Sequence, residues 1–275
     1  MSDRVTCVIT NGVADVRLNR PEKMNAIDGA MFAALADVGE SLKNDVSVRA
    51  VVLSGEGRAF CAGLDFGSFQ AMAGGRGASV LPQGVDADDP ARLPGRITHQ
   101  GQQAVWVWQE IAVPVIAAVH GAALGGGCQI ALGADLRFVA PDVSMSVLEI
   151  RWGLIPDMAG TQLLRNLVGL DVAKDLTFTG RMVGAEEAVR IGLATRVVDD
   201  PRTAAMETAA EIAGRSPDAM RAAKRLLNNA AHVSLADGLA AERREIAALI
   251  GSPNQVEAVT AFFEKRPGNY ANSVR

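Results

Sequence analysis

A short apolar run followed by a glycine triplet constrains the fold of this chain more than any other feature. Residues 113–119 are almost entirely apolar, with Pro114 near the start, and the run ends at His120-Gly121. Such a run is typical of a strand covered on both faces, because a strand with one wet face alternates apolar and polar side chains. Gly125-Gly126-Gly127 then opens a helix expected to reach about Leu132. The chain is therefore expected to be an α/β protein.

The elements on either side fit the same class. Val5–Thr10 and Val13–Leu18 are β-rich runs joined by Asn11-Gly12, a pair that supplies the positive φ angles of a tight hairpin turn. Ile27 to Lys43 has the apolar spacing of a helix, with Asp28 suited to its N-terminal end. Strands are also expected at 49–54 and 135–139. Further helices are expected at 97–111, 158–169, 171–179, 185–191, 202–214, 217–230, 234–250 and 254–264.

One stretch lacks the pattern of either element. Residues 71–94 contain four glycines, three prolines and an Asp-rich run at 86–89. A loop of this length in a compact domain is usually functional or mobile, so we expect a long surface loop. A tolerated insertion is the alternative explanation.

Composition and charge exclude several classes of protein. The chain has 275 residues, 49% of them hydrophobic, and a net charge of −4, which gives no general attraction to nucleic acid or anionic membranes. No apolar run approaches ~18 residues, so no membrane span is expected. The opening residues lead into a strand pattern and not into a signal-peptide pattern, which favours a cytoplasmic protein.

Cysteine and histidine usage argues against metal and thiol chemistry. The three cysteines are widely spaced without a CxxC pair, and the three histidines lie in different expected elements. A disulfide scaffold, a structural zinc site and a Ser-His-Asp triad are therefore not expected. Neither a metal ion nor a bound redox cofactor is indicated.

Two segments rich in small residues carry a family resemblance. Arg58–Asp65 and Val115–Gln129 together resemble the signature segments of the crotonase family, the enoyl-CoA hydratase/isomerase superfamily. Further matches, in order, extend the resemblance from about residue 5 to residue 266: Asn19–Ala26, Ala134–Arg137, Pro156–Thr161 and Ala261–Arg266. The resemblance implies a crotonase-like spiral of β-β-α units over residues 1–200. It also implies a C-terminal helical oligomerisation region over residues 201–275, in a homotrimer or homohexamer.

The resemblance also implies an oxyanion hole. In this family two backbone N–H groups hold the thioester oxygen of an acyl-CoA substrate, and they correspond here to Leu64 and Gly126. Preorganised donors of this kind stabilise a developing negative charge by roughly 3–4 kcal/mol each. Coenzyme A arrives as part of the substrate, so no separately bound cofactor is expected.

The family's acids fall at positions 129 and 149. Hydratases of the family typically carry a carboxylate at both, whereas this chain has Gln129 and Glu149. An amide can orient a water or a substrate carbonyl, but it cannot shuttle a proton at neutral pH. Gln129 is therefore expected to contact substrate or hold a water, with simple packing as the alternative, and Glu149 is expected to be the catalytic acid/base.

Asp157 adds a second carboxylate at a different place. Dienoyl-CoA isomerases of the family carry an Asp at this position, which implies that Glu149 serves C2 and Asp157 serves C6 of the substrate. Those isomerases usually also have an Asp at position 129, which this chain lacks. The alternative role for Asp157 is to cap the helix expected at 158–169.

The remaining substrate contacts are implied by the resemblance alone. Ala62 and Asp65 correspond to the loop that binds coenzyme A, and Lys23 to a residue near its phosphates. Phe262 and Lys265 match residues that contact the coenzyme A of a neighbouring subunit. An amphipathic helix with a solvated end explains these last two residues equally well.

Three functional hypotheses follow. The first is double-bond isomerisation of an enoyl- or 3,5-dienoyl-CoA in fatty-acid or related acyl-CoA degradation, through a thioester enolate. The alternative is hydration of a 2-enoyl-CoA with Glu149 as the sole acid/base. The third is a non-catalytic member that binds acyl-CoA or RNA, although the sequence has no dense Lys/Arg cluster to favour RNA.

Overall fold

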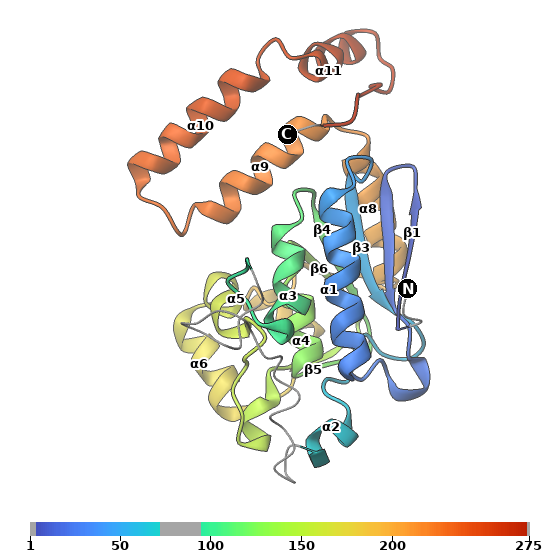
Figure 1. The fold of residues 1–275 in the computed structure, drawn as a ribbon, viewed down its shortest axis with the longest axis vertical. Helices are drawn as coiled ribbons and strands as arrows, with labels where there is room; N and C mark the ends of the chain where they lie inside the picture. The colour runs from blue at the N-terminus through green and yellow to red at the C-terminus, as the bar shows by residue number, and fades with distance from the viewer. Residues whose placement is uncertain (1–3, 72–94, 274–275) are drawn as a thin grey trace.

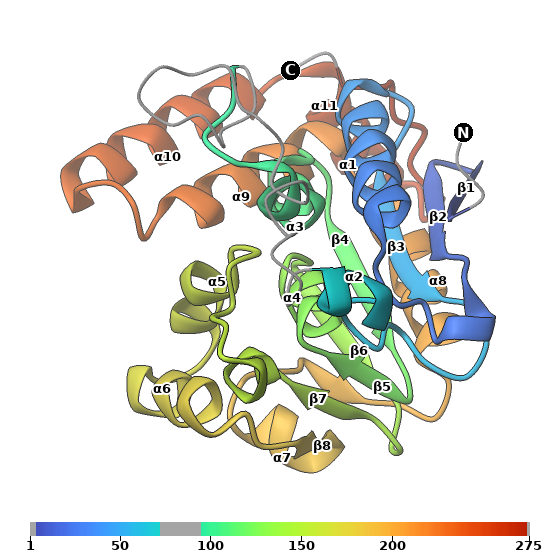
Figure 2. The same cartoon turned by 60° about the horizontal axis from the view of Figure 1, so that its bottom comes forward.

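The computed structural model describes residues 4–71 and 95–273, so the loop expected at 71–94 lies, apart from Ala71, outside the described residues. The strands form two sheets (Figures 1 and 2). The larger has the order β1 (Val5–Thr10), β2 (Val13–Leu18), β3 (Ala50–Gly55), β4 (Val115–Val119), β6 (Leu136–Val139) and β9 (Arg196–Val197). The smaller has the order β5 (Ala122–Leu124), β7 (Ser144–Ser146) and β8 (Val183–Gly184).

The larger sheet is parallel except at its first edge. β1 and β2 are antiparallel, with Thr10 paired to Val13 across the Asn11-Gly12 turn. Both turn residues have positive φ angles, 52° and 79°, so the predicted hairpin is confirmed. The pairs from β2 through β9 are all parallel.

Helices cover both faces of the larger sheet. The helices of the described residues are α1 (Gly29–Asn44), α2 (Phe66–Ala71), α3 (Gln100–Glu110), α4 (Gly126–Leu132), α5 (Gly160–Leu167), α6 (Leu170–Thr179), α7 (Ala185–Arg190), α8 (Pro201–Ala213), α9 (Pro217–Asn229), α10 (Leu235–Leu249) and α11 (Pro253–Phe263), with short 3-10 helices η1 (Pro21–Lys23) and η4 (Leu148–Trp152). As expected, Asp28 is the N-cap of α1, and its side chain accepts from the Met31 N–H.

The side chains of β4 confirm that this strand is covered on both faces. Val115, Ala117 and Val119 belong to a large apolar core that also takes in α1 and α3. Ile116 and Ala118 belong to a second core, which the small side chains of α8 complete. All five residues are at most 1% exposed, which explains why the run contains no polar residue.

The packing of α8 bears on the boundary expected at residue 201. Ala205, Ala209 and Ala213 of α8 are buried against the larger sheet. The helices that stand away from the sheets are α9, α10 and α11, at one end of the molecule (Figure 1). The division into 1–200 and 201–275 stays a prediction, but this helix of the second part packs within the first.

A buried lysine helps to hold α9 against the rest of the chain. Lys224 Nζ donates to Asp135 Oδ2 at 2.7 Å and to the carbonyls of Trp108 and Val113 at 3.0 Å each. In contrast, no residue of α10 is buried. Leu235 and Leu239 of α10 and Phe262 of α11 are exposed apolar side chains. Among the described residues, no helix is both long and apolar enough to span a bilayer.

Candidate active site

Leu64 lies in a single parallel bridge with Ile27, just before α2. The Ile27 N–H donates to the Gly63 carbonyl at 2.8 Å, and the Asp65 N–H donates to the Ile27 carbonyl at 2.9 Å. Because these two bonds flank Leu64, its own N–H points away from Ile27, as in any parallel pair. This N–H therefore faces the other side of the loop.

Gly126 is the first residue of α4. The Gly125 N–H before it donates to the Ser146 carbonyl at 2.8 Å, whereas the first amides of a helix have no partner within that helix. The Leu64 loop runs alongside: a Cβ built on Gly63, where φ is +88°, would lie 2.5 Å from the Leu124 oxygen and 3.8 Å from the Gly126 nitrogen. The structure thus brings the two amides expected to form the oxyanion hole into neighbouring segments.

Two backbone hydrogen bonds join the loop that carries Leu64 to the segment that precedes Gly126. The Cys61 N–H donates to the Ala122 carbonyl at 2.9 Å, and the Leu124 N–H donates back to the Cys61 carbonyl at 3.0 Å. These bonds join the chain before α2 to β5, so α2, α4 and β5 gather at one end of the larger sheet (Figure 2). The smaller sheet therefore positions the site.

Glu149 lies on η4 and is 8% exposed. Its Oε1 accepts from Gln129 Nε2 at 2.6 Å, while its Oε2 is buried without a hydrogen-bond partner among the described residues. Burial raises the pKa of Glu149, the charge of Asp157 raises it further, and hydrogen bonds from Gln129 and from its own backbone only partly oppose this rise. A buried carboxylate with a raised pKa and one free oxygen is suited to proton transfer.

Gln129 is fully buried on α4, and both ends of its side-chain amide are occupied. Its Oε1 accepts from the N–H groups of Met158 and Gly160, at 2.9 and 3.0 Å, while its Nε2 donates to Glu149. These partners all belong to the protein. The expected contact of Gln129 with substrate stays a prediction, and it would use the second N–H of Nε2, since both lone pairs of Oε1 are engaged.

Asp157 is exposed in the turn that leads into α5. That helix begins at Gly160, its N-cap is Ala159, and no side chain caps it. The alternative role of Asp157 as a helix cap is therefore wrong, because the chain makes a left-handed turn at Ala159 before the helix begins. Asp157 lies near enough to Glu149 for its charge to raise the pKa of that residue.

The residues expected around coenzyme A fall into two groups. Ala62 and Asp65 lie on the loop beside Leu64: the Ala62 N–H donates to the Met24 carbonyl at 2.9 Å, and Asp65 accepts from Arg20 at 2.8 Å. The Gly67 N–H is the main cause of a lowered Asp65 pKa, so this carboxylate is ionised at neutral pH. Lys23 is exposed at the end of η1, and its charge also helps to lower the Asp65 pKa.

Phe262 and Lys265 are not part of this group in the single chain. Both are exposed at the end of α11, and Phe262 is 78% exposed. Figure 1 places α11 at the opposite end of the molecule from α2 and β5. Their expected contact with a neighbouring subunit's coenzyme A stays a prediction.

Sequence reasoning assigned no role to Asn25 and Arg20. The Asn25 amide, fully buried, donates to the carbonyls of Glu56, Ala59 and Phe60 and so shapes the approach to Leu64. Arg20 binds Asp65 and the Ala26 carbonyl. Both residues lie in the matched segment 19–26, which was the available signal; apart from Ala26, the partners named here lie more than thirty residues along the chain.

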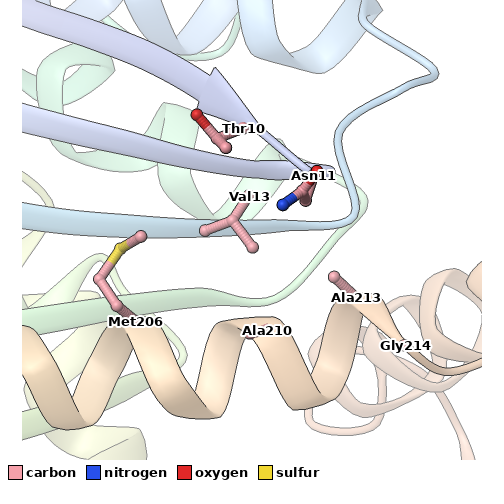
Figure 3. Close-up of a pocket in the computed structure, with 7 residues that line it drawn as sticks. All are labelled: Thr10, Asn11, Val13, Met206, Ala210, Ala213 and Gly214. Carbon is pink, nitrogen blue, oxygen red and sulfur yellow. The ribbon is translucent and has the colours of Figure 1, made fainter.

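A separate hollow lies on the far side of the larger sheet. It has a volume of about 340 Å³ and lies between the hairpin turn and α8, lined by Thr10, Val13, Met206 and Ala210 among others (Figure 3). Its lining contains no titratable side chain, so it lacks the groups that proton transfer needs. Within 4–71 and 95–273, no cluster of three or more His, Cys, Asp or Glu residues could hold a metal ion.

Fold and site together define a protein of the crotonase superfamily, and comparison with known proteins shows the family. The chain belongs to the enoyl-CoA hydratase/isomerase family, whose model matches residues 8–273. It is similar to the short-chain-enoyl-CoA hydratase of Clostridium acetobutylicum, with 34% identity over 261 residues, covering 92% of each chain. It is also similar to the human mitochondrial methylglutaconyl-CoA hydratase, with 32% identity over 267 residues, covering 94% of this chain and 74% of the relative.

The fold comparison agrees. The crystal structure of an enoyl-CoA hydratase from Bacillus anthracis superposes with a TM-score of 0.87 and 30% sequence identity, covering 98% of this chain and all of the other. The expected superfamily and the expected α/β crotonase-like fold with a C-terminal helical region are thereby confirmed.

Proposed function

We propose that this enzyme moves double bonds in an enoyl- or 3,5-dienoyl-CoA through a thioester enolate. The observation that carries the proposal is the state of the Glu149 carboxylate. One oxygen is bound to the Gln129 amide, and the other is buried, without a partner among the described residues. Glu149 thus offers one oxygen to a substrate proton, and residue 129 offers no second acid.

In the proposed reaction the thioester oxygen accepts hydrogen bonds from the Leu64 and Gly126 N–H groups. Glu149 removes a proton from C2, and the electron pair spreads through the dienolate onto the thioester oxygen. Asp157 passes a proton from solvent to C6, which converts a 3,5-dienoyl into a 2,4-dienoyl thioester. Exchange with solvent then returns both carboxyl groups to their starting states. For a 3-enoyl substrate, Glu149 alone returns the proton at C4.

Hydration of a 2-enoyl-CoA is the second candidate, and the names of the similar proteins favour it. The two relatives and the solved structure described above are all called hydratases. Hydration needs a water held for attack at C3, and Gln129 would have only the second N–H of Nε2 left to hold it. In this version Glu149 is the sole acid/base, and it both activates the water and protonates C2.

The substrate carries coenzyme A, so the proposal needs no resident cofactor. Ala62, Asp65 and Lys23 would shape its binding loop, with Phe262 and Lys265 supplied by a neighbouring subunit of a homotrimer or homohexamer. The many exposed apolar side chains of α10 and α11 support an oligomer, because an interface with a neighbouring subunit would bury them.

A side-by-side ultraviolet assay tests the proposal. One cuvette holds a 3,5-dienoyl-CoA and reports formation of the conjugated 2,4-diene; the other holds a 2-enoyl-CoA and reports loss of conjugation on hydration. Faster turnover in the first supports isomerisation, and faster turnover in the second replaces it with hydration. If the wild type and Glu149→Gln both bind acyl-CoA and neither substrate is turned over, the chain is a binding protein. A salt-dependent RNA shift would indicate the RNA-binding alternative.

A further inference from the structure

The side chain of Gln129 joins the two parts of the candidate site that carry acids. From α4 it reaches Glu149, twenty residues later, and the turn at Met158–Gly160, about thirty residues later. Asp157 immediately precedes Met158 in that turn. One buried amide thus contacts the side chain of one proposed proton carrier and the backbone beside the other.

The orientation of this amide is fixed by its partners. Backbone N–H groups can only donate, so the atom facing Met158 and Gly160 must be the carbonyl oxygen of the Gln129 side chain. The NH₂ group must then face Glu149, where it donates to Oε1 at 2.6 Å. An amide turned the other way would set two donors against its NH₂ group and an oxygen against a carboxylate.

The turn that Gln129 holds is conformationally strained. Ala159 has φ +65° and ψ 2°, a left-handed conformation that is unfavourable for a residue with a Cβ. The two N–H groups that flank Ala159 both point at Gln129 Oε1. Gly160 allows this approach, because a Cβ there would lie 2.5 Å from that oxygen.

We infer that Gln129 is a positioning residue that fixes Glu149 and the Asp157 turn relative to one another. It leaves Oε2 as the one Glu149 oxygen available for proton transfer. The inference rests on the proposed function, in which Glu149 is the acid/base. It differs from a substrate contact, because the three hydrogen bonds of the Gln129 amide all join it to protein groups.

Few titratable groups act on the Glu149 carboxyl, so its pKa reports its own hydrogen bonds. Asp157 is the charged side chain that raises the Glu149 pKa. The Cys128 thiol on α4 also senses Glu149, but burial raises the pKa of this thiol to about 12, so it stays neutral over the working range. The Gln129 amide favours the ionised form of Glu149, because it donates to the carboxylate. Loss of this donor should therefore move the acid limb of the pH–rate profile to higher pH.

Gln129→Met removes both functions of the amide with little change in side-chain volume. We expect kcat to fall roughly tenfold or more at neutral pH, the loss expected when a hydrogen bond to a charged group is removed. KM should stay within about twofold, because the inference gives Gln129 no part in binding coenzyme A, and the acid limb should move to higher pH. An unchanged kcat and an unchanged acid limb in the folded variant would overturn the inference.

Two further variants cover the case in which Gln129→Met does not fold. Gln129→Glu keeps an oxygen for the Met158 and Gly160 N–H groups but sets a second carboxylate against Glu149, so the pair should titrate together at higher pH. Gly160→Ala adds no charge and displaces the Gln129 amide only by contact. If the acid limb of the pH–rate profile shifts in Gly160→Ala, Gln129 positions Glu149. If it shifts only in Gln129→Glu, the two side chains are merely close together, and the inference is overturned. Gly29→Ala is the control, since a Cβ there meets nothing within 4 Å.

A measurement without turnover separates this inference from the proposed function. With ¹³C-labelled glutamate side chains, the Glu149 carboxyl resonance is assigned as the one missing in Glu149→Gln. Its titration midpoint should rise in Gln129→Met and in Gly160→Ala, and stay at the wild-type value in Gly29→Ala. If Glu149→Gln retains turnover, the proposed function fails, and this titration still decides whether Gln129 governs Glu149. Unshifted midpoints in both variants would refute the inference, whatever the activity.

Discussion

Lys224 Nζ and Asp135 Oδ2 lie 2.7 Å apart, and this pair links α9 to the residue that precedes β6. Lys224 also donates to the carbonyls of Trp108 and Val113, while Asp135 Oδ2 accepts from the Val115 N–H. Burial lowers the pKa of Lys224, and the attraction of Asp135 partly opposes that shift. Lys224 is thus a buried cation at the base of the helices that stand away from the sheets, beside Arg221, which donates to the Val48 carbonyl.

Lys224→Met should destabilise the protein by about 1.5–3 kcal/mol, the scale of a lost hydrogen bond to a charged group, because the Asp135 side chain keeps 21% of its surface exposed. Chemical denaturation measures the loss, and hydrogen exchange should show it first in α9. Lys174→Met on α6, where the lysine is exposed, is the matched control and should change stability little. Equal stability of Lys224→Met and the control would show that the pair does not hold α9.

Glu149→Gln should stabilise the protein at neutral pH while it removes activity. The folded-state pKa of Glu149 is raised above its usual 4.5, so ionisation of this residue opposes folding. This loss of stability is absent below the pKa of Glu149 in the unfolded chain. It grows as pH rises from that value through the higher pKa of the folded state, and it is complete above the folded pKa. The Tm of Glu149→Gln should therefore exceed that of the wild type at pH 8, and the difference should vanish near pH 4. A lower Tm at pH 8 would contradict the raised pKa.

Asp157→Asn should reduce turnover of a 3,5-dienoyl-CoA by roughly a hundredfold, the scale of general acid catalysis. Conversion of a 3-enoyl-CoA, which needs Glu149 alone, should fall much less. Because Asp157 caps no helix, the Tm of Asp157→Asn should stay close to that of the wild type. Equal losses on both substrates would remove Asp157 from the role at C6.

Gly126→Pro should reduce kcat by roughly 10²–10³, the effect of losing one oxyanion donor. Proline is well tolerated at the first position of a helix, so α4 itself should survive. A side chain here also approaches Ile27 and Met158, since a Cβ would lie 2.9 Å from each. Gly126→Ala brings the same contacts and keeps the N–H, so the ratio of the two variants isolates the donor. Equal kcat values in both variants would exclude this N–H from the reaction.

The sequence predicts best the elements whose signals are local. Asn11-Gly12 forms its hairpin, Asp28 caps α1, and residues 115–119 form a strand buried on both faces, because each depends on neighbours along the chain. The smaller sheet escaped prediction, because its strands are two or three residues long and none can show an alternating pattern. The helix expected at 158–169 begins at Gly160, since no local signal announces the left-handed turn at Ala159.

In the candidate site, too, the positions of the residues could be predicted from sequence, but their contacts could not. Leu64, Gly126, Glu149 and Asp157 were identified by resemblance, which supplies positions without contacts. The hydrogen bonds of Gln129 join residues 20 to 31 positions apart, and only the folded chain shows which atom faces which partner. Sequence could state that residue 129 is an amide, but not that both ends of the amide are occupied.

The hydrogen bonds of Gln129 also bear on how a glutamine and a glutamate can replace one another at this position during evolution. Glutamine and glutamate codons differ at a single base, and the two side chains differ only in whether an NH₂ group or an oxygen faces Glu149. The oxygen that receives the Met158 and Gly160 N–H groups is common to both, so the turn retains its support through the exchange. A single nucleotide therefore separates a site with one carboxylate at this point from a site with two, with no other part of the scaffold rebuilt.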